Sequence, residues 1–451
     1  MNVGFVSLGC SKNLIDTEMM IGVFKNNNFN IVNNPEEADV IVINTCGFIE
    51  SAKQEAINTI LEMAQYKKMG KCKILVATGC LVERYKEELE KALPEVDIFL
   101  KYSDYAEEKG KSAEVFAKVL EKIYKEKNKE NIKNTELDFM NRIVTTGRNY
   151  AYVRIAEGCD NRCTYCAIPY IRGAFISRKM EDIEAEVNRI VKSGRKEIIL
   201  IAQDTSKYGK DIYGKPMLAE LIDRLCKIKE LKWIRFLYTY PEDIDDKLIE
   251  VVKNNEKVCK YFDIPIQHIS DRVLKRMNRK TTGVDIRKTI NKLRENIPDV
   301  VIRTTIMVGF PGETKEEFEE LYNFVKEEKF DKLGAFMYSK EDGTPAARLK
   351  EQVHPMTKKS RYNKIMQLQQ EVSGENEKRQ IGRILEILVE QIAPDKKYYI
   401  GRSYMDVPEI DGAAYVKIKD GEKIDENLVG QYIKCRVKEV KNYDIICEKM
   451  N

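Results

Sequence analysis

Three cysteines in the middle of the chain are spaced like ligands. Cys159, Cys163 and Cys166 follow the pattern C-x3-C-x2-C, and the residues between them are polar, which argues against inert thiols packed in a core. A structural zinc site needs four ligands, and the two histidines, His268 and His354, form no ligand pair. Three thiolates can hold a [4Fe-4S] cluster that leaves one iron open to an outside ligand. The spacing therefore predicts an iron–sulfur cluster.

A second set of cysteines is spread over the first hundred residues. Cys10, Cys46 and Cys80 each end a strand-like apolar run, and the intervals of 36 and 34 residues match one strand–helix unit each. Each thiol alone could be inert at a buried strand end. Because parallel strands end at one edge of a sheet, about 4.8 Å apart, the repeated register favours convergence on a second three-cysteine cluster. Three flanking glycines would allow close backbone approach: Gly9, Gly47 and Gly79.

Alternating strands and helices must position both sets, so the expected fold class is α/β. Residues 1–105 alternate apolar runs with helical segments at 17–27 and 49–65, which predicts a parallel sheet. Six strand-like runs between 150 and 340 alternate with helices, which predicts a partial (β/α)6 barrel of the TIM type. The C-x3-C-x2-C loop directly follows the first of these strands, at the mouth where barrel active sites lie.

The remaining segments divide the chain. Residues 106–145 have the pattern of a charged helix that runs into a polar linker. A long helix is expected at 360–380, and short strands with turns follow it, which predicts a small β-barrel. We expect a cluster domain at 1–115, a linker at 116–144, the partial barrel at 145–375 and the β-barrel at 376–451. The other five cysteines are expected to be structural: Cys72, Cys226, Cys259, Cys435 and Cys447.

The loop spacing resembles that of radical S-adenosylmethionine (SAM) enzymes, in which the open iron chelates SAM. Tyr165 fits the aromatic residue that these enzymes often carry before the last cysteine. Gln203 and Asp204 end the second strand at the same mouth and could hold the SAM amino group or the substrate. Gly309 and Gly312, in the segment GFPGET, would admit a ligand close to the backbone, although an ordinary strand-to-helix turn explains them equally well.

Taken together, these residues resemble the methylthiotransferases over nearly the whole chain. This radical-SAM family has two clusters and three domains: an N-terminal cluster domain, a radical-SAM barrel and a C-terminal TRAM β-barrel. The matching stretches include SLGCSKNLIDTE, NTCGFIESAK, GCLVERY, IAEGCDNRCTYCAIP, IAQDTSKYG, DIPIQHIS, GFPGET and GRSYMDVPEIDG. They are similar to the subfamily that modifies an aspartate of a ribosomal protein. Ser11 departs from the proline that is usual in that subfamily, and it is not a ligand.

The resemblance implies a division of labour. The cluster on Cys10, Cys46 and Cys80 would carry the sulfur, and the cluster on the loop cysteines would cleave SAM to a 5′-deoxyadenosyl radical. A second SAM would supply the methyl group. The product would be a methylthio group on the β-carbon of an aspartate of small-subunit ribosomal protein twelve, free or on the ribosome. A sulfur donor and an electron donor would be further partners.

Two other functions compete with this prediction. A transfer-RNA adenosine methylthiotransferase would use the same chemistry on another substrate. A non-catalytic iron–sulfur sensor would leave the six-unit barrel and the GFPGET segment unexplained. Residues 376–451 hold 14 basic and 14 acidic residues, so strong nucleic-acid binding is not expected. Because ribosomal proteins are typically basic, we expect Asp406, Glu409 and Asp411 to face the protein substrate, although these acids could merely solvate a loop.

The composition excludes several other classes. Charged residues make up 33% of the 451 residues, yet the net charge is only +4, which is not the balance of a protein that coats nucleic acid. The sequence has no apolar run of about 18 residues and its start has no signal-peptide pattern, so we expect a cytoplasmic protein without a membrane segment. In that reducing compartment, 11 cysteines indicate metal or redox chemistry rather than disulfides.

Overall fold

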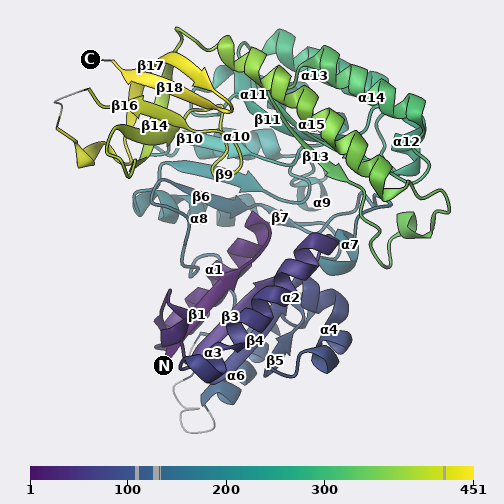
Figure 1. Cartoon of the computed structure of the whole chain (residues 1–451). Helices are drawn as coiled ribbons and strands as arrows, with labels where there is room; N and C mark the ends of the chain where they lie inside the picture. The colour runs from purple at the N-terminus through teal and green to yellow at the C-terminus, as the bar shows by residue number, and fades with distance from the viewer. Residues whose placement is uncertain (107–110, 125–131, 133, 420–422, 451) are drawn as a thin grey trace.

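The computed structural model describes residues 1–106, 111–124, 132, 134–419 and 423–450. Figure 1 shows three parts: an N-terminal α/β domain, a central domain of strands and covering helices, and a small C-terminal β-barrel. The predicted α/β class and the three-part organisation are confirmed. In the described part of the chain, no helix is both long enough and apolar enough to span a membrane.

The N-terminal domain contains a parallel sheet of five strands in the order β2-β1-β3-β4-β5. Its strands are β1 (Asn2–Ser7), β2 (Asn30–Ile31), β3 (Val40–Thr45), β4 (Ile74–Gly79) and β5 (Ile98–Leu100). Its helices are α1 (Ser11–Asn26), α2 (Glu50–Ala64), α3 (Tyr66–Met69), α4 (Cys80–Ala92), α5 (Tyr102–Ala106) and α6 (Lys111–Tyr124). Because β1, β3 and β4 are direct neighbours, the three cysteines that follow them lie at one edge of the sheet, as the sequence predicts.

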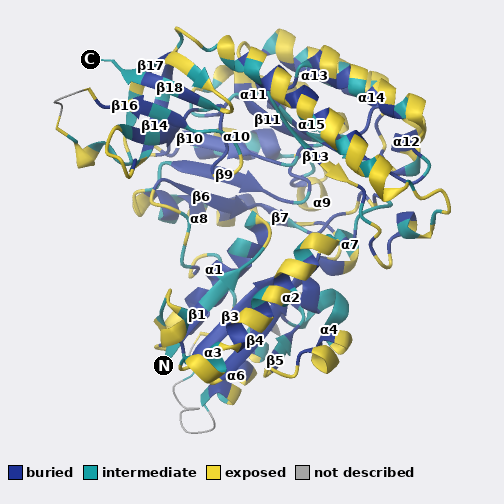
Figure 2. Cartoon of the chain, viewed as in Figure 1, coloured by how far each residue is buried: buried dark blue, intermediate teal, exposed yellow. Residues whose placement is uncertain are grey.

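Helix α1 is buried on nearly all sides, which the sequence did not predict. It begins at Ser11, six residues before the expected start, and it lies between its own sheet and the central domain (Figure 2). Met20 and Phe24 pack on the N-terminal sheet, whereas Ile15 and Met19 belong to a buried cluster with residues from the inner face of the barrel. The helix therefore joins the N-terminal domain to the central domain.

The segment predicted as a solvated linker differs in the structure. Phe116, Val119 and Leu120 of α6 are buried in the core of the N-terminal domain. Arg142 is fully buried and pairs with Glu18 of α1 at 2.5 Å. The abundant charges of this region concealed both contacts. Residues 125–131 and 133, which belong to the predicted linker, lie outside the described residues.

The central domain has the six parallel strands that the sequence predicts. They are β6 (Tyr150–Arg154), β9 (Glu197–Ile201), β10 (Trp233–Phe236), β11 (Tyr261–Gln267), β12 (Val301–Val308) and β13 (Lys332–Met337). They form the arrays β10-β9-β6 and β11-β12-β13, and a parallel bridge between Ile234 and Val258 connects the two. A short hairpin pairs β7 (Ala156–Glu157) with β8 (Ile176–Ser177). This is a partial barrel.

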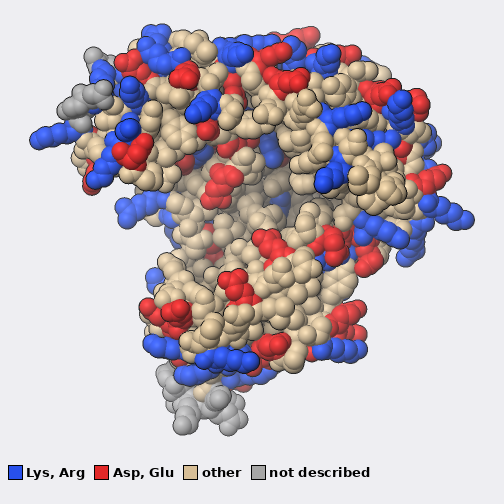
Figure 3. Space-filling view, in the orientation of Figure 1, with Lys and Arg blue, Asp and Glu red and all other residues tan. Residues whose placement is uncertain are grey.

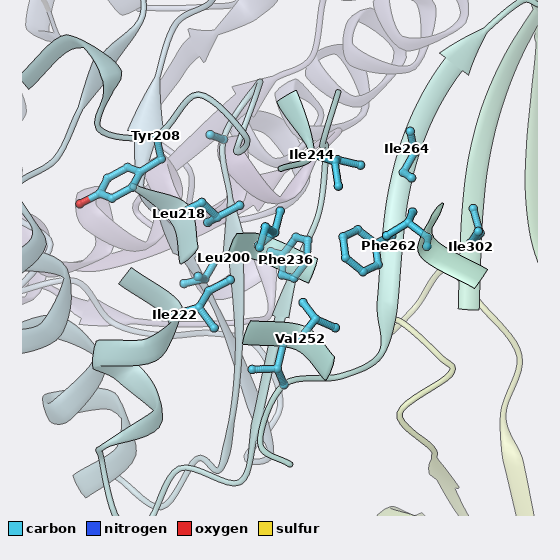
Figure 4. Packing of buried hydrophobic residues seen from close by; sticks show 14 of the residues in the cluster. Leu200, Tyr208, Leu218, Ile222, Phe236, Ile244, Val252, Phe262, Ile264 and Ile302 are labelled. Carbon is cyan, nitrogen blue, oxygen red and sulfur yellow. The ribbon is translucent and has the colours of Figure 1, made fainter. Parts of the chain in front are cut away.

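Helices cover the outer face of this barrel. They are α8 (Met180–Lys192), α10 (Leu218–Cys226), α11 (Asp246–Asn254), α13 (Gly283–Asn296), α14 (Lys315–Glu328) and α15 (Pro355–Lys378), with the short helices α7 (Ile168–Ile171), α9 (Lys210–Tyr213) and α12 (Asp271–Arg276) in the loops. Figure 4 shows Leu200, Phe236 and Phe262 packed between strands and helices. Burial of this outer layer stabilises the strands whose ends carry the site, at roughly 25 cal/mol per Å² of apolar surface.

The C-terminal domain is a closed five-stranded barrel in the order β14-β15-β16-β18-β17. Its strands are β14 (Ile384–Ile392), β15 (Tyr398–Arg402), β16 (Ala414–Lys417), β17 (Tyr432–Lys441) and β18 (Asp444–Lys449). Cys435 and Cys447 pack in its core, as predicted. A buried ion pair between Arg402 and Glu197, at 2.7 Å, fastens this domain to the central barrel.

Candidate functional site

The strand-end cysteines lie at the edge of the N-terminal sheet where its strands end. Cys10 is the N-cap of α1, Cys46 directly follows β3, and Cys80 opens α4. Gly9 has a φ of +83°, and a Cβ atom there would lie 2.8 Å from the Cys46 Sγ atom. Burial raises the pKa of Cys80 to about 11, Arg172 opposes this rise, and the neighbouring Cys10 and Cys46 add to it. The three thiols thus lie within electrostatic reach of one another.

The loop cysteines follow the first barrel strand, at its carboxyl end. Cys159 and Cys163 are buried, and Cys166 is partly buried. Burial raises the pKa of Cys166, and Cys163 and Cys159 raise it further. Thr164 holds the loop in place, because its N–H donates to the Met277 carbonyl at 3.0 Å and its hydroxyl to the Arg276 carbonyl at 2.9 Å. The loop is therefore fixed to the other side of the barrel mouth.

Both sets of cysteines are better suited to bind an iron–sulfur cluster through their thiolates than to bind a single metal ion. Among the described residues, no three Cys, His, Asp or Glu side chains are arranged to hold one metal ion. A cluster makes a different demand, because each thiolate binds its own iron and the sulfurs need not meet at one point. Free thiols that are grouped, partly desolvated and flanked by glycine match that donor set.

The two sets of cysteines adjoin each other, and α7 lies between them. Cys80 packs with Ala167, which directly follows the last loop cysteine, and with Ile171 at the end of α7. Arg172 then reaches back into the N-terminal domain, where its guanidinium lies 3.5 Å from the Cys80 Sγ atom and pairs with Asp16 at 2.6 Å. One short segment of the barrel domain thus carries the loop thiols at one end and contacts a strand-end thiol at the other.

The residues predicted to bind SAM lie at the same barrel mouth. Gln203 donates to Glu157 at 2.7 Å, and its buried Oε1 atom has no hydrogen-bond partner in the described part of the chain. Asp204 is fully buried, accepts from Asn161 in the cysteine loop at 2.8 Å and pairs with Lys207. Asp204 therefore already has partners that hold the loop. The free acceptor on Gln203 is the atom that an ammonium group would suit.

The GFPGET segment forms a tight turn beside Tyr165. The ring of Tyr165 meets Phe310 edge to face, with 6.5 Å between centroids. Gly309 and Gly312 have positive φ angles, as a tight turn requires, and the side chains nearest to them are Lys358 and Arg276 of the chain itself. These two side chains therefore fill the space beside the two glycines.

Glu313 fixes this turn from inside. It accepts from the N–H groups of Gly309 and Phe310 at 2.5 and 3.1 Å, and it pairs with Arg361 of α15 at 2.7 Å. Burial raises the pKa of Glu313 to about 7, although Arg361 opposes the rise. Glu313 could not be recognised from the sequence, because a glutamate at the start of a helix is ordinarily exposed.

The acidic stretch of the C-terminal barrel requires a correction. Asp406 is buried and pairs with Lys332 at 3.2 Å, and Asp411 accepts from the Tyr261 hydroxyl at 2.7 Å. Only Glu409 of the three is exposed, and it accepts from the Tyr150 hydroxyl at 2.9 Å. These acids connect the small barrel to the central domain, so Asp406 and Asp411 are not a free docking surface. Composition alone could not reveal that tyrosines and a lysine face them.

Several buried polar residues of α1 were also missed. Lys12, Asn13 and Asp16 are all at least nine-tenths buried where α1 meets the barrel domain. Asp16 pairs with both Arg154 and Arg172 at 2.6 Å. Their spacing is that of one helical face, which in a single sequence indicates a solvent-exposed face. In the space-filling view, the surface is hollowed where the N-terminal domain meets the barrel domain (Figure 3).

Comparisons with known proteins agree with this architecture. Residues 2–101 match the model of the uncharacterized protein family UPF0004, residues 153–325 match the radical SAM superfamily, and residues 381–449 match the TRAM domain. Among solved structures, the radical SAM methyltransferase TsrM from Kitasatospora setae has a TM-score of 0.55 at 11% identity and covers 76% of each chain, which shows a shared fold. A radical SAM domain implies a [4Fe-4S] cluster and SAM as cofactors.

Curated relatives match over the full length. The chain is 57% identical over 448 residues to the ribosomal protein uS12 methylthiotransferase RimO of Alkaliphilus oremlandii, with 99% of each chain covered. It is 48% identical over 459 residues to the protein of the same name from Acetivibrio thermocellus, with 100% of this chain and 98% of the relative covered. The chain therefore belongs to the family of ribosomal protein uS12 methylthiotransferases RimO, which are radical SAM enzymes.

Proposed function

We propose that this enzyme adds a methylthio group to the β-carbon of an aspartate of ribosomal protein uS12, and that it uses two [4Fe-4S] clusters. The substrate follows from the full-length similarity to uS12 methylthiotransferases. The single observation that carries the two-cluster arrangement is the contact of two thiol sets through α7 and Arg172. An electron donor and a sulfur donor complete the set of partners, and the proposed location is cytoplasmic.

The substrate carbon explains why such an arrangement is needed. The β-CH₂ of an aspartate is a very poor acid, and a general base contributes only about 10²–10⁴-fold in rate. The loop cysteines would hold the cluster that, with SAM, would supply radical chemistry for removal of a hydrogen atom, and the strand-end cysteines would hold the cluster that would supply the sulfur. The chain's own task is to hold the two thiol sets, SAM and the aspartate within one enclosed space.

Individual residues support that task. Cys159, Cys163 and Cys166 would hold the SAM-binding cluster, and Cys10, Cys46 and Cys80 the other. Tyr165 and the GFPGET turn with Gly309 and Gly312 would line one side of SAM. On the other side, Gln203 would accept from its amino group, and Asp204 would position the cysteine loop through Asn161. The side chains of Lys358 and Arg276 would move aside where SAM approaches the two glycines.

A transfer-RNA substrate is the alternative, and the C-terminal barrel disfavours it. Residues 376–451 have no net charge, and RNA binding depends on neutralisation of phosphates by Lys and Arg. The test compares the two substrates side by side. The iron-loaded enzyme, SAM and a reductant are incubated with purified uS12 and, separately, with unmodified transfer RNA. Mass spectrometry should find a methylthio group on one aspartate of uS12 and none on adenosine. Modification of transfer RNA alone would overturn the proposal.

A further inference from the structure

Lys12 is a buried cation without a counter-ion. It lies in the first turn of α1, and only 7% of its surface is exposed. Its Nζ atom lies 3.1 Å from the centroid of the Tyr238 ring. Within the described residues, this ammonium group makes no ion pair and no hydrogen bond with a side chain or a carbonyl. Burying an unpaired ammonium group is costly, so its place in the fold requires an explanation.

The neighbouring charges are already paired. Arg154 and Arg172 both pair with Asp16 at 2.6 Å. Of the carboxylates near Lys12, Glu157 pairs with Arg154 at 2.7 Å and Asp263 pairs with Arg303 at 2.9 Å. Lys12 is thus the cation of this region that the fold leaves unmatched among the residues described.

The beginning of α1 adds to this positive charge. Among the residues that the structure describes, its N-cap, Cys10, makes no side-chain cap hydrogen bond, and its first turn contains no acidic residue. The N-terminus of a 16-residue helix carries a partial positive charge and free N–H groups. The buried ammonium group and the helix terminus therefore point independently to a bound anion.

The place of this anion is between the two sets of cysteines. Lys12 follows Cys10 of the strand-end set by two residues. Its ammonium group rests on Tyr238, which follows β10 at the mouth of the barrel domain, so the side chain crosses from the N-terminal domain into that mouth. A target carbon must be reached by both a radical and a sulfur, and it must therefore lie in this space.

We infer that Lys12 binds the side-chain carboxylate of the substrate aspartate and so places its β-carbon between the two thiol sets. This inference rests on the proposed function and names the chemical group that the site recognises. A carboxylate is directly bonded to the β-carbon, so one ion pair at the carboxylate fixes the position of the reacting CH₂. Lys12 is a positioning residue, and it would make the enzyme prefer aspartate to its neutral isostere, asparagine.

The test compares two peptides and several variants. Peptides of uS12 that carry the target aspartate, or asparagine in its place, are titrated against the full-length, iron-loaded enzyme with SAM but without reductant. We expect the wild-type enzyme to bind the aspartate peptide about 100-fold more tightly, as is typical when a desolvated charge pair is broken. K12M should bind both peptides equally weakly, and K12R should recover part of the preference.

Lys25, an exposed lysine in the last turn of the same helix, provides the matched control. K25M should retain the wild-type preference for the aspartate peptide. The peptide comparison on the wild-type enzyme needs no substitution, so equal binding of the two peptides would overturn the inference even where K12M does not fold, and the milder K12R variant then tests the role of Lys12.

Three outcomes would overturn the inference while leaving the proposed function in place. Equal binding of the two peptides by the wild-type enzyme would show that the enzyme does not recognise the carboxylate. An unchanged aspartate preference in K12M, together with a raised Kd for SAM, would assign Lys12 to the carboxylate of SAM. An unchanged preference with a lower iron content would assign it to the strand-end cluster. If the wild-type enzyme modifies no uS12 at all, the proposed function fails first, and the inference fails with it.

Discussion

The two sets of cysteines are built in opposite ways. The loop set lies within eight residues of one segment, and its spacing is visible in the sequence. The strand-end set comes from three strands that are neighbours only because the sheet order is β1-β3-β4. A local set can be recognised from a motif, whereas a set that depends on topology exists only when the whole sheet has folded. We therefore expect the strand-end set to be more sensitive to damage elsewhere in its domain.

Their surroundings differ as well. A guanidinium group, that of Arg172, reaches Cys80 of the strand-end set. The loop set faces aromatic residues, since the Cys163 Sγ atom lies 3.9 Å from the Tyr240 hydroxyl. Hydrogen bonds to sulfur and nearby charge tune the potential of a cluster. The difference indicates that the two sites are adjusted for different tasks, in line with the proposed division between SAM cleavage and sulfur transfer.

Removal of the loop set should have the largest effect. We expect the variant in which Cys159, Cys163 and Cys166 are replaced by Ala to lose one [4Fe-4S] cluster and all SAM cleavage. The reason is that the other two cysteines of the barrel domain lie elsewhere, Cys226 at the end of α10 and Cys259 just before β11. Iron analysis and detection of 5′-deoxyadenosine after reduction measure both. SAM cleavage at the wild-type rate would contradict the assignment.

Removal of the strand-end set should separate the two activities. Replacement of Cys10, Cys46 and Cys80 by Ala should lower the iron content, abolish methylthiolation of uS12 and leave SAM cleavage measurable, because these thiols belong to another domain. The loop variant serves as the control, because it should lose SAM cleavage whereas the strand-end variant should keep it. An iron content equal to that of the wild-type enzyme would show that these cysteines hold no cluster.

The sequence predicted those parts of the fold and site that depend on local pattern. The six barrel strands and the strand ends at Cys10, Cys46 and Cys80 were predicted because each has a short apolar run. These three cysteines were predicted to lie close together because parallel strands end at one edge of a sheet. The sheet order confirms that β1, β3 and β4 are neighbours. The domain boundaries at residues 115, 144 and 375 stay predictions.

Other features required the tertiary structure. The burial of Lys12 and Asp16 depends on a second domain that covers the polar face of α1, and no local pattern distinguishes a face covered by protein from one covered by water. For the same reason, Asp406 and Asp411 were predicted to face the protein substrate, although they face Lys332 and Tyr261. Interfaces between domains are thus where the sequence analysis was weakest.

Loss of Arg172 should sharpen the contrast between the two sets. Arg172→Met removes a buried partner of Asp16 and the donor to Cys80, so we expect a loss of about 3 kcal/mol in stability. A cluster at the strand-end cysteines should also shift to a more negative potential, because a cation is removed. Redox titration followed by electron paramagnetic resonance measures this shift, and Arg172→Lys should restore part of it.

Arg178 supplies the matched control for that experiment. It is a mostly buried arginine that pairs with Glu186 at 2.6 Å and has no thiol partner among its described contacts. Arg178→Met should cost similar stability and leave the cluster potentials unchanged. Equal shifts in both variants would mean that the potential responds to general loosening of the fold and not to the contact between Arg172 and Cys80.

The last expected effect is a pH dependence of stability that arises at the barrel mouth, near the loop set of cysteines. Burial raises the pKa of Glu313 to about 7 in the folded chain, above the ordinary value of 4.5. The folded state then binds a proton that the unfolded state has lost, so this group's stabilisation is complete below about pH 4.5 and disappears as the pH rises through 7. The full change is on the order of 3 kcal/mol, or several degrees in the melting temperature.

Glu313→Gln keeps an acceptor for the N–H groups of Gly309 and Phe310 but cannot ionise. Between pH 5 and about 8, we therefore expect the wild-type melting temperature to fall relative to that of Glu313→Gln, because only the wild-type side chain must ionise inside the barrel mouth. Glu316→Gln, an exposed change in the same helical turn, should leave the wild-type pH profile unaltered. Parallel profiles for the wild-type protein and Glu313→Gln would show that Glu313 stays ionised over this range, held by Arg361. In that case the turn beside Tyr165 would present a charged carboxylate to SAM and not a neutral one.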